Sequence, residues 1–285
     1  MTVTAQDLEP PANDPNNNIA ATATGSALAP TLQPSQTPSQ IPFTESPSTT
    51  DPTSQFLEDL PPPTGIPQSP NQIISPGSGS KVISPFILRA AIKPGQNSVV
   101  RIELLGEDGR LLMREIRGYQ SPQTEWISLG SEISFGINEI AESGRLVISI
   151  EDEQGRLQSV SSVDLILGSD GDQDLNLPPD LLEDIVLESP PENRLIQDGN
   201  MRVSGLARVR SSRPLRIEII TSDGKIVGTR QVSVTLSENN SYGTFAIDVP
   251  YAISNTQRVR VQVWEPGDRI PGIVNLSSVE VLLSP

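Results

Sequence analysis

Apolar and polar residues alternate along two stretches of this chain that are close copies of each other. The first, RIELLGEDGRLL, covers residues 101–112, and the second, RIEIITSDGKIV, covers residues 216–227 and starts 115 residues after the first. Alternation with a period of two is typical of a β-strand with one buried face. The Asp-Gly pair in each copy predicts a hairpin turn, because glycine adopts positive φ without steric cost. The pattern therefore predicts a duplicated β-hairpin.

The strands around each hairpin repeat as well. The apolar row at residues 146–150 is matched at 259–263, and the Ser-Ser-Val row at 161–163 is matched at 277–279. About seven short strands in each repeat, separated by turn residues and without helical periodicity, predict an all-β fold of two tandem β-sandwiches. The expected core of the first repeat includes Trp126, Ile127 and Leu129. Trp264 is expected in the core or at a strand end of the second repeat.

The repeats resemble the immunoglobulin-like domain of bacterial spore-germination proteins and other secreted bacterial proteins. The resemblance covers 72–168 and 188–285 and rests on a Ser-Pro entry, an apolar strand with small residues, a strand, an Asp-Gly turn, a strand and a final Val-rich strand. The small residues are Arg89-Ala90-Ala91 and Ser204-Gly205-Leu206-Ala207; the glycine that members tend to have is present only as Gly205. The resemblance implies accessory immunoglobulin-like β-sandwiches outside the cytoplasm and provides no catalytic residues.

Two segments lie outside the repeats. Residues 1–71 contain fourteen prolines, seven acidic residues and no basic residue, so we expect a disordered Pro/Ser/Thr-rich linker that cannot bury a core. Residues 169–187 form an acidic linker between the two domains. The net charge of −15 is concentrated here, with −7 in residues 1–71 and −7 in residues 168–188, against −3 and +2 in the two repeats.

The absence of certain residue types excludes much covalent chemistry. The chain has no cysteine and no histidine, which removes Cys and His nucleophile systems, His general bases and nearly every zinc or copper site. Paired carboxylates remain the general acid/base option. However, Glu103 and Glu218 stand beside Arg101 and Arg216 on outward strand faces, where charge pairing explains them more simply. We therefore predict no catalytic residue and no enzymatic activity.

The acidic linker contains the candidate metal site. Asp170, Asp172 and Asp174 stand on alternate residues, a spacing that resembles the start of a calcium loop. Leu175 occupies the position where an EF-hand needs its turn glycine, and Leu181 occupies the position of its last glutamate. A solvated acidic spacer without a cofactor is the alternative, and calorimetry with calcium or chelator would separate the two interpretations.

A group of arginines in the second repeat, Arg208, Arg210 and Arg213, is the candidate contact with a protein partner, because arginine is enriched in protein interfaces. The chain lacks the basic stripe of a nucleic-acid binder. Tryptophan and tyrosine residues are few and scattered, although a glycan remains an alternative ligand.

These observations favour a non-enzymatic extracytoplasmic protein that displays two immunoglobulin-like domains for adhesion or for assembly with other envelope or surface proteins. The alternatives are a carbohydrate-binding accessory module and a cytosolic scaffold protein. The first ten residues lack the charged and apolar parts of a signal peptide. The chain is then either a cytosolic protein or a secreted or envelope-anchored protein whose leader is absent from this sequence. The Pro/Ser/Thr-rich segment before compact β domains favours the second form. No apolar stretch is long enough for a transmembrane segment.

Overall fold

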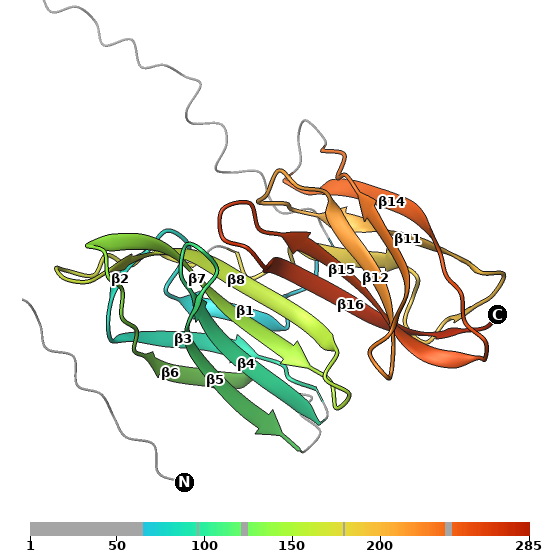
Figure 1. Cartoon of the computed structure of the whole chain (residues 1–285), viewed down its shortest axis with the longest axis horizontal. Coiled ribbons are helices and arrows are strands. Elements are labelled where there is room, and N and C mark those ends of the chain that lie inside the picture. Colours follow the sequence, from blue (N-terminus) through green and yellow to red (C-terminus); the bar gives the residue numbers. More distant parts are fainter. Residues whose placement is uncertain (1–64, 96, 121–124, 179, 237–240) are drawn as a thin grey trace, which may run out of the picture. The chain divides into compact units, whose positions relative to one another are not determined.

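The computed structural model describes residues 65–285 except 96, 121–124, 179 and 237–240 (Figure 1). The described residues form sixteen β-strands and no helix, so the predicted all-β class is confirmed. None of their elements is a helix that could cross a membrane. Both repeats fall within one compact unit, Thr53–Pro285. The disorder predicted for residues 1–64 lies outside the described residues.

The first repeat forms a sandwich of two sheets. One sheet has the order β1-β3-β6, and the facing layer consists of β4, β5, β7 and β8, with β2 parallel to β8. The strands are β1 (Asn71–Ser75), β2 (Lys81–Ile83), β3 (Phe86–Ile92), β4 (Ser98–Leu105), β5 (Leu111–Tyr119), β6 (Ile127–Ile133), β7 (Ala141–Glu151) and β8 (Leu157–Gly168).

The second repeat reproduces this plan strand by strand. Its smaller sheet has the order β14-β11-β9, and its larger layer consists of β12, β13, β15 and β16, with β10 parallel to β16. The strands are β9 (Ile185–Ser189), β10 (Leu195–Ile196), β11 (Asn200–Ala207), β12 (Leu215–Thr221), β13 (Ile226–Val232), β14 (Gly243–Pro250), β15 (Gln257–Pro266) and β16 (Ile273–Leu283). In chain order, β1 to β8 are therefore the counterparts of β9 to β16.

The duplicated hairpins form as the alternation predicts. In β4 every second residue is fully buried, including Ile102 and Leu104, and the adjacent residues face outward. Gly109 and Gly224 adopt φ values of 80° and 82°, which only glycine adopts without strain. Each hairpin thus presents one apolar face to the core of its own sandwich, and each sandwich has a separate core cluster.

Three boundary or core expectations need correction. Trp126 is 41 % exposed, whereas Leu129 is buried, because β6 begins one residue after the tryptophan. Residues 65–71 belong to the fold, since the Ser69 amide donates to the Leu181 carbonyl and Asn71 starts β1. The linker assigned to residues 169–187 is shorter than expected, because Ile185 already starts β9.

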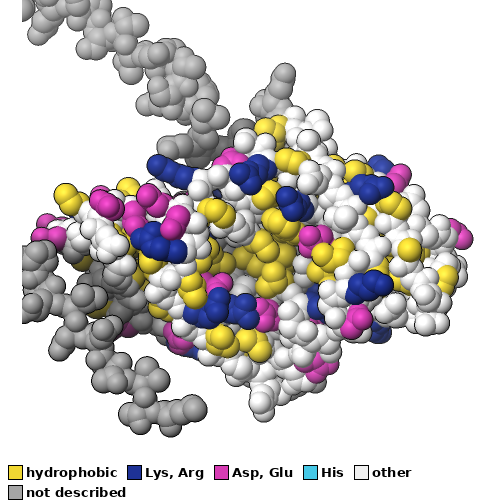
Figure 2. All heavy atoms as spheres, viewed as in Figure 1, with side chains coloured by type: hydrophobic (Ala, Val, Ile, Leu, Met, Phe, Trp, Pro, Cys, Tyr) yellow, Lys and Arg dark blue, Asp and Glu magenta, His cyan; other side chains and the backbone are white. Residues whose placement is uncertain are grey.

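The two larger layers join into a single ten-stranded sheet. Its main path runs β13-β12-β15-β16-β8-β7-β4-β5, and the two repeats meet where β16 pairs antiparallel with β8. Two residue pairs form this contact, Leu276 with Val160 and Ser277 with Ser159. Hydrophobic side chains gather in the middle of the face shown in Figure 2, with charged side chains around them. The sheet makes the joint between the sandwiches the central feature of the fold.

Candidate functional site: the joint between the sandwiches

Two of the three candidate calcium residues, Asp170 and Asp174, make separate contacts in the linker. Asp170 accepts a hydrogen bond from the Gly171 amide at 2.7 Å, and the backbone of Asp174 exchanges two hydrogen bonds with that of Lys81, the first residue of β2. Within the described part of the chain, no group of three or more His, Cys, Asp or Glu residues could hold a metal ion. The linker instead runs along the first sandwich, held by backbone contacts.

The predicted arginine cluster is divided among three acidic partners, Asp180, Asp184 and Asp268. Arg208 binds Asp180 through two hydrogen bonds of 2.6 and 2.8 Å and also contacts Asp184 at 2.8 Å. Arg210 binds the other oxygen of Asp184 at 2.8 Å, whereas Arg213 pairs separately with Asp268 at 3.3 Å. Arg208 and Arg210 therefore fasten the acidic linker to the second sandwich.

The charges and aromatic contacts around Arg208 also support its role in holding the linker. The hydrogen bonds from Arg208 hold the pKa of Asp180 below its ordinary value, against the opposing effect of burial. The Arg208 guanidinium also lies 5.1 Å from the ring centre of Tyr242. Burial raises the pKa of Tyr242 to about 12, and its hydroxyl donates to the Glu183 carbonyl at 2.8 Å. Both charged and aromatic contacts keep the linker in place.

A second charged network crosses from one repeat to the other. Asp152 and Arg156 belong to the β7–β8 turn of the first repeat, where they bind each other at 2.8 Å. Arg156 reaches Glu280 on β16 at 2.7 Å, and Arg260 on β15 reaches Asp152 at 3.1 Å. All but Glu280 have side chains at most 12 % exposed. Removing one partner of an ion pair this well buried strongly destabilises a protein, because the other charge is left buried without a partner.

An apolar cluster completes the joint. Val147 and Val160 of the first repeat pack with Leu276 of the second, and all three are buried. Trp264 lies against this cluster rather than in the core of its own sandwich, and the Arg216 guanidinium sits 5.2 Å from the centre of its ring. The expectation of a core or strand-end position for Trp264 is thus refined to a position between the repeats.

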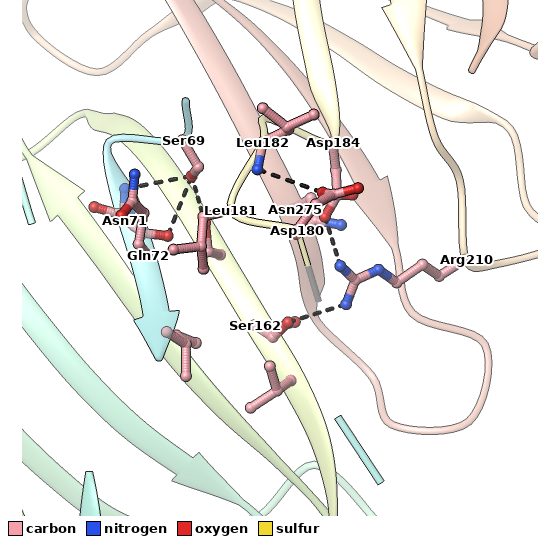
Figure 3. Close-up of a pocket in the computed structure, with 13 residues that line it drawn as sticks. Ser69, Asn71, Gln72, Ser162, Asp180, Leu181, Leu182, Asp184, Arg210 and Asn275 are labelled. Atoms are coloured by element: carbon pink, nitrogen blue, oxygen red, sulfur yellow. Dashed lines mark hydrogen bonds and ion pairs between the residues drawn. The ribbon is translucent and has the colours of Figure 1, made fainter. Parts of the chain in front are cut away.

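Small cavities surround the joint. One of about 40 Å³ lies beside Asp184 and Arg210, whose side chains point toward each other, with Arg210 also donating to the Ser162 carbonyl (Figure 3). A polar groove of about 310 Å³ and a more apolar one of about 200 Å³ are also lined by residues of both repeats. Glu183 lines the larger groove, and burial raises its pKa to about 7.

The residues of the joint hold the two sandwiches together through ion pairs, hydrogen bonds and apolar contacts. Both repeats could be predicted from the sequence, but this joint could not, because it depends on which strands become neighbours. A usable signal was present in the serine pairs of β8 and β16. Ser162 and Ser278 occupy matching positions of β8 and β16, and both hydroxyls bind across the joint.

Comparisons with known proteins give no family. No protein-family model matches this chain, and no curated protein matches it. Among solved structures, a transglutaminase of red sea bream aligns at 8 % identity and a TM-score of 0.27, over 77 % of this chain and 31 % of that one. The exo-chitosanase CsxA of Amycolatopsis orientalis aligns at 11 % identity and a TM-score of 0.21, over 68 % and 25 %.

The adhesin CfaE of enterotoxigenic E. coli aligns at 8 % identity and a TM-score of 0.21, over 75 % of this chain and 82 % of that one. This chain spans about a third or less of the transglutaminase and the chitosanase. Likenesses with such low TM-scores do not bear on fold or function.

Proposed function

We propose that this chain is a non-enzymatic, extracytoplasmic protein that presents two immunoglobulin-like sandwiches as one rigid module for assembly with other envelope or surface proteins. The observation that carries the proposal is the joint, where a shared sheet, a buried ion network and an apolar cluster connect the repeats. Independent domains that merely share a linker do not need such a connection.

A rigid joint favours binding because it fixes surfaces of both repeats before a partner arrives. Ordering two mobile domains during association costs free energy, and a preorganised module avoids this cost. The Pro/Ser/Thr-rich composition of residues 1–71 supports a role in which this module is held away from an anchor. The composition and the resemblance to secreted immunoglobulin-like domains together support an extracytoplasmic location.

We propose Arg208, Arg210 and Arg213 as the region of partner contact, with Arg213 as its most accessible member. Its side chain is 55 % exposed, whereas Arg208 and Arg210 are mainly engaged with Asp180 and Asp184. A partner carboxylate could replace Asp268 on Arg213 without disturbing the linker. The same exchange at Arg208 would release the linker.

Site-specific photo-crosslinking tests this proposal in cells. A photoreactive residue at position 213 should give a crosslinked band in the envelope fraction, because that position lies in the partner contact. The matched control is position 202, where Arg202 is similarly exposed and pairs with Asp248. A protein found only in the cytosol would contradict the proposed location. Equal crosslinking at positions 213 and 202 would contradict the proposed contact. Measurable hydrolase turnover by the purified protein would contradict the non-enzymatic role.

A further inference from the structure

The strands that join the repeats are each other's counterparts. Val160 on β8 pairs with Leu276 on β16, and these residues are 116 residues apart. The same offset aligns the Ser-Ser-Val row at 161–163 with the row at 277–279. A residue that pairs antiparallel with its own counterpart lies on a local two-fold axis, as at the centre of a symmetric homodimer.

A second pair of counterparts meets in the same way. Gln68, which precedes β1, forms an isolated antiparallel bridge with Leu182, which precedes β9. The bridge is reciprocal, since Ser69 donates to the Leu181 carbonyl and Glu183 donates to the Pro67 carbonyl, both at 3.0 Å. The offset of 114 residues is the one that aligns the Ser-Pro pairs at 75–76 and 189–190. Two separate places in the joint therefore obey one pseudo-symmetry.

The side-chain hydrogen bonds of the joint follow this symmetry. The Ser162 hydroxyl donates to the Val274 carbonyl at 2.8 Å, and the Ser278 hydroxyl donates to the Gln158 carbonyl at 2.7 Å. Donors and acceptors are both related by 116 residues. One hydrogen bond thus occurs twice, once in each direction, which is the defining property of an isologous interface.

Apolar contacts and turns show the same reciprocity. Leu157 and Ile273, also 116 residues apart, flank the apolar cluster together. The β7–β8 turn reaches the second repeat through Arg156 and Glu280, and the β15–β16 turn reaches the first through the Ile270 carbonyl, which accepts from Arg145 at 3.0 Å. Each repeat therefore offers the other a version of the same surface.

We propose that the β8 and β16 edges form a self-recognition surface through which two copies of this chain exchange repeats. The first repeat of one copy would pair with the second repeat of another, through the contacts that hold one chain together. Exchange of identical elements needs no new interface, because every contact of the joint is reused. The partner is therefore a second copy of this chain, and this inference does not depend on the contact proposed at Arg213.

The connecting segment sets the balance between closed and exchanged forms. During refolding, before its ion pairs have formed, the connecting segment tethers the two repeats at an effective concentration on the order of 1 mM. At about 0.1 mM protein, on the order of a tenth of the joints should then form between chains after refolding. Crowding at a surface would raise this fraction by mass action.

Cysteine crosslinking of the full chain tests the exchange, since the chain has no cysteine of its own. Val160→Cys and Leu276→Cys are made in separate chains, unfolded in urea, mixed, refolded together and oxidised. The control that places both cysteines in one chain should form an internal disulfide, which verifies that the variants fold and that the two positions meet. The mixture should give a disulfide-linked dimer whose share rises with protein concentration.

Two results would overturn the proposal. One is a mixture that stays monomeric at 0.1–1 mM, on the order of the effective concentration, while the double variant crosslinks fully. The other is crosslinking of Val160→Cys alone to the same extent as the mixture, because in the exchanged dimer position 160 faces position 276. Deletion of residues 170–173 should increase the dimer fraction by hindering internal closure, and an unchanged fraction would also contradict the exchange.

Discussion

The segments that lead into β1 and β9 share their backbone contacts but differ in their side chains. The Lys93 amide donates to the Pro70 carbonyl at 2.8 Å, and its counterpart, the Arg208 amide, donates to the Asp184 carbonyl at 2.7 Å. In the second repeat, the side chains of Arg208 and Asp184 also form an ion pair. Their counterparts in the first repeat, Lys93 and Pro70, cannot form one, because proline has no charged side chain. The shared pattern builds the sandwiches, and the unshared side chains fasten the linker.

The two inner turns differ in the same manner. The turn of the first repeat carries the buried pair of Asp152 and Arg156, whereas the turn of the second buries Ile270 and uses its backbone carbonyl. A pseudo-symmetric joint is thus held by charge on one side and by apolar and backbone contacts on the other. Substitutions that act on one side only should separate these contributions.

The largest expected effect comes from the charged side. Arg156→Ala removes one partner from a buried network and should lower the free energy of unfolding by about 3–5 kcal/mol, because Asp152 and Glu280 lose their shared cation. Urea unfolding measures this loss. Arg202→Ala is the control, since that pair is exposed and should matter by less than about 1 kcal/mol. Equal losses would show that the joint does not depend on its charges.

Glu183 provides a pH-dependent comparison, because its counterpart at the matching position is Ser69. Burial raises the pKa of Glu183 from 4.5 to about 7. Folding therefore favours the neutral acid, so this group lowers stability progressively as pH rises from about 4.5 to 7. Ionisation at pH 8 should cost up to about 3 kcal/mol, at 1.36 kcal/mol for each pKa unit.

Glu183→Gln should therefore raise the melting temperature at pH 8 and leave it nearly unchanged at pH 4. The control Glu192→Gln removes an exposed carboxylate from the same groove, so it separates the effect of burial from that of removing a charge. A stabilisation by Glu183→Gln that is equal at both pH values would contradict burial as its cause.

The smaller sheets of the two repeats differ at one position, where only the second repeat has a glycine. At Gly205, an added Cβ would overlap the Val186 carbonyl oxygen, whereas Ala90 occupies the corresponding place in the first repeat. Gly205→Ala should displace β9 and cost about 1–3 kcal/mol, as overpacking usually does. Ala90 is buried in the core of the first repeat, so Ala90→Gly should cost about 1–2 kcal/mol through backbone entropy and the lost burial of one methyl group. Thermal unfolding of both variants distinguishes the two, and a larger loss for Ala90→Gly would contradict the close approach at Gly205.

The smallest expected losses of stability should be nearly equal in the two repeats. Ser162→Ala and Ser278→Ala each remove one copy of the repeated hydrogen bond, and each should cost about 0.5–1.5 kcal/mol. Ser169→Ala removes a hydrogen bond from the exposed linker and serves as the control. Clearly unequal losses at positions 162 and 278 would show that the two sides of the joint are not energetic counterparts.

Local alternation was sufficient to predict the strands and turns of each repeat. Rows such as Ile102 with Leu104 and Ile217 with Ile219 indicated buried strand faces, and all four residues are fully buried. Asp-Gly pairs indicated the turns. Trp126 was misplaced because an apolar residue just before a strand has no partner that fixes its direction.

The joint could not be predicted because it depends on contacts across the repeats. The aspartates at 180 and 184 suggested a solvated linker, since nothing in the sequence shows that they face Arg208 and Arg210. The pairing of β8 with β16 was equally hidden, because each strand could also have served as a free edge. The matching Ser-Ser pairs of the two strands were its one local sign.

A distance measurement between the sandwiches tests the rigid joint most directly. Spin labels at Arg89→Cys and Arg202→Cys occupy exposed positions on the two repeats, and the native chain has no cysteine that would compete. Double electron–electron resonance on monomeric protein should give one narrow distance distribution, which Arg156→Ala should broaden. A broad distribution in the otherwise unaltered chain, insensitive to Arg156→Ala, would contradict the account of two repeats held as one module.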